Sequence, residues 1–251
     1  MSAAESQAGD VRPRPARMHS AHTVTLGVVY CTGNAGKFRE ASFVFDEWNA
    51  SGQPLKVEYL QKDADPVEIQ GSAPEVCQAK VEAATNIIVE RGELDHLARC
   101  CCHRYDVVTE DVGLELGCLN GFPGVYCKPM LEAVGDGGLW DLVRRYDDKS
   151  ARVTCSLGYC PVDVRFDGRI QAAGRGRTGM FVGALEGSIG PPRGDIKHGA
   201  TSWNSVFTPT GRARTFGETP FDEQATFSHR RQAIMEYLRS TQESMLAVAH
   251  D

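Results

Sequence analysis

The order of hydrophobic patterns between residues 24 and 90 constrains the fold more than any other feature of the chain. Residues 24–31 are a valine-rich apolar run, which is typical of a buried strand. A helix is predicted after it, because Phe38, Ala41, Phe45 and Trp48 recur at helical spacing. A second strand over 55–60 and a second helix over 74–90 follow. Alternation of strand and helix predicts an α/β sheet with short connections.

The rest of the chain extends this pattern with further strands and helices. Residues 105–109 predict a third strand that ends at Glu110-Asp111. The later elements are predicted as helices over 124–134 and 138–146, β-rich sequence over 151–182, and a final amphipathic helix over 222–239. We expect residues 23–251 to form one domain, with residues 1–22 as a disordered extension poor in apolar side chains.

Composition and charge narrow the possible partners. The formal net charge is -6, so no overall positive field favours nucleic acid or an anionic membrane surface. No apolar run approaches the roughly 20 residues that a membrane helix needs. Acidic residues near the N-terminus argue against an organellar signal, and we expect a cytoplasmic protein without nucleic-acid or membrane partners.

Nine cysteines are an odd number, as expected for buried thiols in a reducing compartment. One cluster, Cys100-Cys101-Cys102-His103, invites comparison with a soft-metal site. Adjacent residues do not converge on one tetrahedral ion, and no second half of such a motif follows. An exposed or interface loop is the simpler interpretation of this cluster.

The first candidate site is the loop Thr32-Gly33-Asn34-Ala35-Gly36-Lys37, between a strand and a helix. A helix start presents unpaired backbone N–H groups and the positive end of the helix dipole, so it favours anions. Glycine permits close approach of a phosphate, and Lys37 adds a mobile positive charge. An ordinary helix start capped by Asn34 is the alternative. The loop does not match the P-loop pattern, because no Ser or Thr follows the lysine.

A second candidate site pairs Glu68, in the loop before the second helix, with Asp111, just beyond the third strand. Loops at the carboxyl ends of neighbouring strands converge, so the two acids are placed to share a hard cation such as Mg²⁺. That ion would neutralise triphosphate charge and lower the pKa of bound water. Solvated surface acids are the alternative, and Glu110 is a rival for the catalytic role.

Two further features carry less weight by themselves. Lys80 flanks the apolar stripe of its helix, either as a lysine with a buried stem or as a phosphate ligand. Ser228-His229-Arg230 opens the last helix, where an imidazole and a planar guanidinium are suited to contact a nucleobase.

Together, these features resemble the inosine-triphosphatase family of nucleotide pyrophosphatases over roughly residues 24 to 238. Further matching points are Gln70-Gly71, Gly113-Leu114, Gly121-Phe122-Pro123-Gly124, Asp148-Lys149-Ser150, Pro192-Arg193-Gly194, Phe207, Pro209, Gly211, Thr215-Phe216 and Glu218. The resemblance implies an elongated, two-lobed α/β fold with a central mixed sheet flanked by helices, and an active-site cleft between the lobes. It also implies a homodimer that hydrolyses ITP, dITP and XTP to monophosphate and pyrophosphate.

The resemblance assigns roles to individual residues. Thr32, Gly33, Asn34, Ala35, Gly36 and Lys37 would hold the phosphates, with Lys37 and Asp111 as catalytic residues. Glu68 and Asp111 would bind Mg²⁺, and Asp111 would activate water. The nucleotide contacts would come from Lys80, Trp203, Asn204, His229 and Arg230, the last two reading the 6-keto edge of the base. An amino group at that edge would leave their donors unpaired.

The departures from the family pattern lie at the base end. The family usually has Phe-Gly-Trp/Tyr-Asp-Pro, whereas this chain reads Thr201-Ser202-Trp203-Asn204-Ser205. A stacking ring is replaced by Thr201, an acid by Asn204, and a lysine before the Ser-His-Arg motif by Gln224. These departures therefore bear on the preferred base and leave the predicted phosphate and metal end of the site unchanged.

Two alternatives remain open at this point. The first is the related Maf-like class, which has the same fold and prefers other modified nucleotides. The Ser-His-Arg motif and the Pro-Arg-Gly turn argue against it. The second is a nucleotide-binding protein that has lost turnover. Lys37, Glu68 and Asp111 argue against it, since a protein that only binds nucleotide needs neither a metal site nor a general base.

Overall fold

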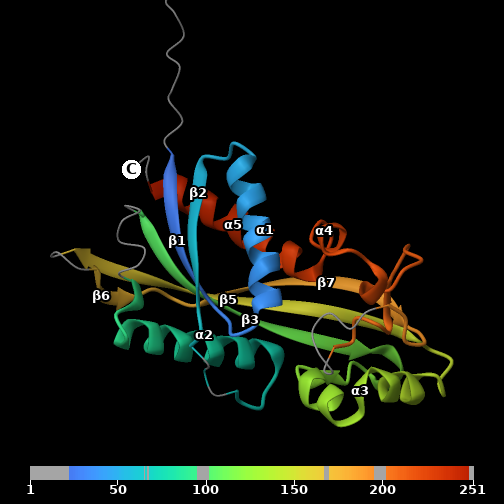
Figure 1. Cartoon of the computed structure of the whole chain (residues 1–251). Helices are drawn as coiled ribbons and strands as arrows, with labels where there is room; N and C mark the ends of the chain where they lie inside the picture. The colour runs from blue at the N-terminus through green and yellow to red at the C-terminus, as the bar shows by residue number, and fades with distance from the viewer. Residues whose placement is uncertain are drawn as a thin grey trace, which may run out of the picture.

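The structure, a computed structural model, describes residues 23–64, 66, 68–94, 102–166, 170–194 and 202–248, and only the backbone over 165–166 and 170–175. These residues form one curled, mixed sheet flanked by helices, as Figure 1 shows. Its strands are β1 (Val24–Cys31), β2 (Leu55–Lys62), β3 (Arg104–Leu116), β4 (Pro123–Gly124), β5 (Ser150–Phe166), β6 (Ile170–Arg175), β7 (Gly179–Ile189) and β8 (Phe207–Pro209). The predicted α/β fold is confirmed.

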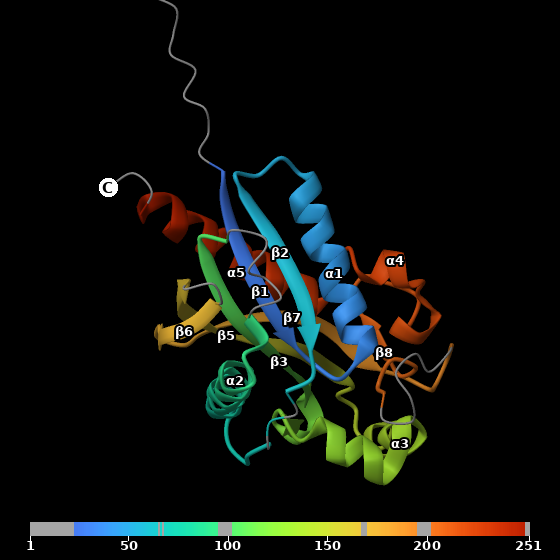
Figure 2. The ribbon, with the colours of Figure 1, turned by 60° about the vertical axis from the view of Figure 1, so that its left-hand side comes forward.

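The helices are α1 (Ala35–Ala50), α2 (Ala73–Glu90), α3 (Cys127–Val143), α4 (Phe221–Gln224) and α5 (His229–Val248), with short 3₁₀ turns at Gly117–Leu119 and Phe216–Glu218. α1 and α5 pack on one face of the sheet and α2 on the other (Figures 1 and 2). α3 covers the far end of the sheet, beside the distal halves of β3 and β5. No helix in the described part of the chain is long and apolar enough to cross a membrane.

The sheet order is β2-β1-β3-β5-β7-β8, with β4 added beside β3 and β6 beside β5. β1 runs parallel to both β2 and β3, and the remaining pairs are antiparallel. The carboxyl ends of β1 and β2 therefore point to the same edge, where β3 continues beyond them. This edge is where loops can bring side chains together.

Two lobes share the long strands. In the first lobe, α1, α5 and α2 bury apolar side chains such as Phe45, Tyr237 and Ile88 against β1 and the first half of β3. In the second lobe, α3 and the segment around Trp203 pack on Leu114 and neighbouring residues of β3, β5 and β8. The sheet links the lobes, because β3 and β5 contribute to the core of both.

The third strand is longer than predicted. It was expected to end before Glu110, but β3 continues to Leu116 and pairs with β5 along its whole length. Leu114 and Leu116 are fully buried in the second lobe, which stabilises the extension. Glu110 and Asp111 are therefore neighbours within a strand, and their side chains point to opposite faces of the sheet.

One helix prediction is confirmed and another was wrong in detail. Residues 124–134 and 138–146 were expected as separate helices, and α3 consists of two helical segments that meet at a kink at Gly135, whose φ of 67° is not helical. The final helix was expected over 222–239, whereas α4 ends at Gln224 and α5 begins at His229. The Ser228 hydroxyl accepts a hydrogen bond from the Arg231 N–H at 3.0 Å and caps the new helix.

The cysteine and histidine cluster lies partly outside the described residues, which exclude 95–101. Within them, His103 Nδ1 accepts a hydrogen bond from the Thr25 N–H at 3.0 Å. No group of three or more His, Cys, Asp or Glu side chains suited to a metal occurs in the described residues. His103, the residue before β3, is thus hydrogen-bonded to the start of β1.

Candidate active site

A cleft of about 480 Å³ lies between the two lobes, at the carboxyl ends of β1 and β2. The first lobe lines it with the loops after these strands and with the start of α1. The second lobe lines it with the start of α3 and the segment around Trp203. Most of the predicted site residues meet here: Thr32, Gly33, Asn34, Lys37, Glu68, Lys80, Asp111, Trp203, Asn204, His229 and Arg230 all line the cleft.

The loop after β1 is a capped helix start. Asn34 Oδ1 accepts hydrogen bonds from the backbone N–H groups of Gly36 at 2.9 Å and Lys37 at 3.1 Å. The Asn34 cap, given above as the alternative, is therefore present. It leaves the Lys37 side chain, 25% exposed, to carry the positive charge of this loop into the cleft. Ala35 and Gly36 are the first residues of α1 and supply its backbone rather than polar side chains.

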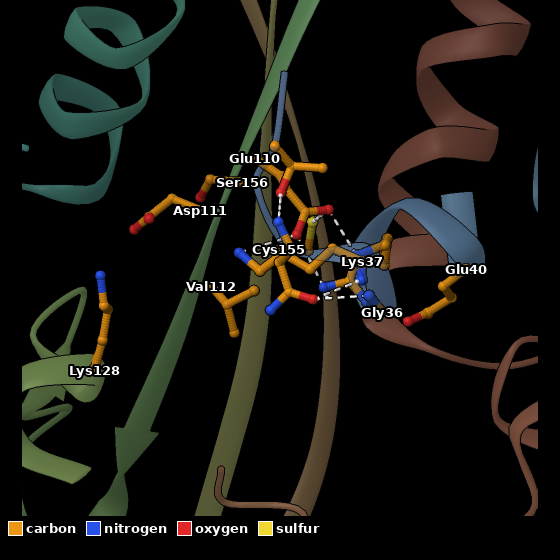
Figure 3. Close-up of polar contacts among 12 residues, drawn as sticks. Gly36, Lys37, Glu40, Glu110, Asp111, Val112, Lys128, Cys155 and Ser156 are labelled. Carbon is orange, nitrogen blue, oxygen red and sulfur yellow. Dashed lines mark hydrogen bonds and ion pairs between the residues drawn. The ribbon is translucent and has the colours of Figure 1, made fainter. Parts of the chain in front are cut away.

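Glu110 is the centre of a buried polar network (Figure 3). Its carboxylate accepts hydrogen bonds from Arg230 Nε at 2.6 Å, from Arg230 Nη2 at 2.9 Å and from the Tyr30 hydroxyl. The Lys37 ammonium lies 3.2 Å from Glu110 Oε1. Burial raises the pKa of Glu110, but the Arg230 and Lys37 charges outweigh it and hold the pKa well below its usual range. The carboxylate of Glu110 is thus ionised, and its oxygens bind other side chains of the protein.

Arg230 is held on its other side by Glu40. The third guanidinium nitrogen, Nη1, pairs with Glu40 Oε2, and the Ser228 hydroxyl donates to Glu40 Oε1. All three guanidinium nitrogens are therefore bonded to carboxylates, and the whole group is buried. Sequence analysis missed Glu40 and Tyr30. Their signal was a charged side chain on the buried face of a helix and a hydroxyl within an apolar strand.

Asp111 faces the opposite side of β3, at one end of a chain of alternating charges. The Lys80 ammonium lies 3.1 Å from Asp111 Oδ1 and 3.7 Å from Glu68 Oε1. Burial lowers the pKa of Lys80, but Asp111 and Glu68 more than compensate and keep the lysine protonated. The Lys128 ammonium, which sequence analysis overlooked, lies 3.9 Å from Glu68 Oε1, and Figure 3 shows it on the Asp111 side.

The two predicted metal ligands therefore converge, because one ammonium contacts both carboxylates. Oxygen ligands are the donors that Mg²⁺ prefers, and this ion often takes only one or two carboxylates together with substrate phosphates. Glu68 and Asp111 fit that donor set. Chemically, the arrangement places an acceptor for a water proton beside three lysines, Lys37, Lys80 and Lys128, that can balance phosphate charge.

The other end of the cleft is aromatic and polar. Trp203 packs against His229 with ring centroids 5.6 Å apart and against Phe216 at 5.4 Å. Gln224 is buried and donates both amide hydrogens, to the carbonyls of Phe216 and of Thr219 at 2.7 Å. Asn204 is only 3% exposed. Thr201, the third position where the chain departs from the family pattern, lies outside the described residues.

Comparison with solved structures gives the class of fold. The Ham1 protein of Staphylococcus aureus superimposes with a TM-score of 0.60, at 20% identity over 87% of this chain and 99% of that chain. A nucleoside-triphosphatase (dITP/XTP pyrophosphatase) of Mycobacterium abscessus gives 0.51 at 22% identity, over 84% and 97%. The fold is therefore the two-lobed α/β fold of these proteins.

The chain belongs to the Ham1 family, whose sequence model matches residues 28–240. It is similar to the inosine triphosphate pyrophosphatase of Yarrowia lipolytica, with 33% identity over 212 residues, which are 83% of this chain and 92% of the relative. The enzyme of that name from Schizosaccharomyces pombe is 31% identical over 214 residues, 85% and 94% of the two chains. The predicted family resemblance is confirmed.

Proposed function

We propose that this protein is a nucleoside-triphosphate pyrophosphohydrolase that converts non-canonical purine nucleotides, namely ITP, dITP and XTP, to monophosphate and pyrophosphate. The observation that carries the proposal is the meeting of Glu68 and Asp111 at one ammonium, inside a cleft whose facing loop presents Lys37. The relatives named inosine triphosphate pyrophosphatase give independent support. Such an activity removes damaged nucleotides from the pool.

Each residue then has a task. Lys37, Lys80 and Lys128 hold the negative charge of the triphosphate, and Asp111 accepts the proton of the attacking water. The water oxygen bonds to the α-phosphorus, and pyrophosphate leaves with the electron pair of the broken α–β anhydride bond. Glu68 and Asp111 would hold Mg²⁺, which would supply charge neutralisation and a more acidic bound water. Lys80 contacts both carboxylates and would balance their charge beside the metal.

The buried hydrogen-bond network around Glu110 gives this residue a different role from its neighbour Asp111. Glu110 points away from Asp111 and already accepts bonds from Tyr30 and Arg230. A carboxylate with all its partners in place is a poor proton acceptor, since its pKa is held low. We therefore assign proton transfer and metal binding to Asp111 and exclude Glu110 from both.

One experiment distinguishes the enzyme from a protein that only binds nucleotide. Pyrophosphate release from ITP is measured with and without Mg²⁺, beside a panel that includes dITP, XTP, GTP and modified pyrimidine nucleotides. We expect magnesium-dependent release from the inosine and xanthosine nucleotides. Binding without release would favour the inactive nucleotide-binding protein, and preference for pyrimidines would favour a Maf-like specificity.

Assembly and location are also proposals. A homodimer is implied by the family resemblance, and light scattering of the purified full chain, which gives its mass in solution, checks it. A cytoplasmic location is checked by imaging the tagged full chain in cells.

A further inference from the structure

The base end of the cleft holds a buried side-chain donor, Asn204, that lacks a partner among the described residues. Asn204 Nδ2 is fully buried and makes no hydrogen bond within the part of the chain that the structure describes. A buried donor without a partner has lost its bonds to water and gained none in return, so buried amides are nearly always bonded. Asn204 lines the cleft, and a ligand there is the natural source of the missing acceptor.

The position of Asn204 is fixed by its own backbone. Its N–H donates to the Ser202 hydroxyl at 3.1 Å, and its carbonyl accepts from the Gly217 N–H at 2.7 Å. Both of these neighbours belong to the second lobe, beside Trp203 and Phe216. The amide is therefore held at the aromatic end of the cleft by two backbone hydrogen bonds.

The neighbouring donors are largely engaged. Arg230 uses three of its five N–H groups on Glu110 and Glu40. Gln224 uses both of its amide hydrogens on the carbonyls of Phe216 and Thr219, which leaves only its own oxygen as an acceptor. Of these three side chains within the described residues, Asn204 alone has a fully buried nitrogen with no partner.

Resting on the function proposed above, we propose that Asn204 is the specificity-determining residue at the base end, and that its amide N–H donates to the 6-keto oxygen of the purine. Arg230 holds Glu110 and Glu40 beside this contact, and a neutral amide shares in the recognition of the base. A keto base satisfies this donor, whereas an amino group at the same place leaves it unpaired.

The test pairs a change in the protein with a change in the nucleotide. Asn204→Ala removes the donor, and purine-riboside triphosphate lacks the 6-oxygen. The specificity constant is measured for ITP and for purine-riboside triphosphate with the wild-type protein, Asn204→Ala and Asn204→Asp. We expect the ITP-to-purine-riboside ratio to fall about 10-fold in both variants, because the wild-type protein alone makes the bond. Asn120→Asp, the same change at an exposed residue outside the cleft, controls for added charge.

Two results would overturn the proposal. An unchanged ratio in both Asn204 variants would make the residue structural. A higher ratio in Asn204→Asp would mean that the amide presents its oxygen to a base N–H.

The outcome for Asn204 can be separated from the outcome for the enzyme. The same ratio is measured as equilibrium dissociation constants for the two nucleotides with EDTA present, where turnover is not needed. Absence of pyrophosphate release from every nucleotide would contradict the proposed function. The ratio of dissociation constants would then still decide the role of Asn204.

Discussion

Asp111→Asn should abolish most turnover while leaving the fold intact. The substitution keeps the shape of the side chain but removes its charge, and with it the proton acceptor and one proposed metal ligand. Positioned general bases contribute about 10²- to 10⁴-fold, so we expect turnover of ITP to fall about 100-fold or more. The Michaelis constant should change much less, since Lys37 and Lys128 are untouched.

The structural cost of this change is small. Lys80 loses a charged partner at 3.1 Å but keeps Glu68 at 3.7 Å, and an amide oxygen can still accept its hydrogen bond. Hydrogen bonds to charged groups contribute about 1.5–3 kcal/mol, so a loss of about 1–2 kcal/mol in the free energy of unfolding is expected. A domain of ordinary stability tolerates that loss.

A matched control lies four residues further along the same strand. Glu115 pairs with Arg152 at 3.1 Å, and it does not line the cleft. Glu115→Gln should leave turnover near the wild-type value. Pyrophosphate release and thermal unfolding by circular dichroism are measured for both variants. Near-native turnover in Asp111→Asn, or an equal loss in Glu115→Gln, would refute the assignment of Asp111.

Three further predictions concern other parts of the site and the fold. Lys37→Ala should raise the Michaelis constant for ITP more than that for IDP, and the difference should shrink at high salt; an equal rise for both would make Lys37 structural. Glu110→Gln should cost about 3–5 kcal/mol in urea unfolding at pH 7, because it leaves buried cations uncompensated. Because the folded pKa of Glu110 is depressed, the stabilisation from its ionised form is present above an unfolded pKa of about 4.3 and is lost as pH falls. The variant should therefore lose less stability between pH 7 and pH 3.5, and an equal loss would contradict this. Gly183→Ala should destabilise by about 3 kcal/mol or more, because its Cβ would lie 1.9 Å from the His229 carbonyl oxygen; an unchanged melting temperature would show that α5 shifts freely.

Sequence patterns predicted the first lobe more closely than the second. β1, α1, β2 and α2 lie within a few residues of their predicted places, because the apolar run of β1 and the apolar positions of the other three elements are buried. The extension of β3 depends on packing between distant segments. Gly113 gave no local sign that Thr154 of β5 would lie against it.

The site divides in a similar way. Glu68 and Asp111 were predicted to converge from the order of strands, and Lys37 was placed separately at the helix start after the first strand. The structure brings all three to one cleft. The network of Glu110, Glu40 and Tyr30 was not predicted, since nothing local links residues 80 or more positions apart. Such partners become visible only when β1, β3 and α5 are packed together.

The carboxylate of Glu110 has one further consequence, for how specificity is expressed. It touches Lys37 at the phosphate end of the cleft and Arg230 at the base end. A nucleotide that binds to Arg230 would weaken the ion pair of Arg230 with Glu110, and this would also alter the ion pair of Glu110 with Lys37. The identity of the base then affects the rate of the chemical step as well as binding, so discrimination between bases should appear in kcat. Substitutions at the two ends should accordingly combine non-additively, although the residues concerned need not touch one another.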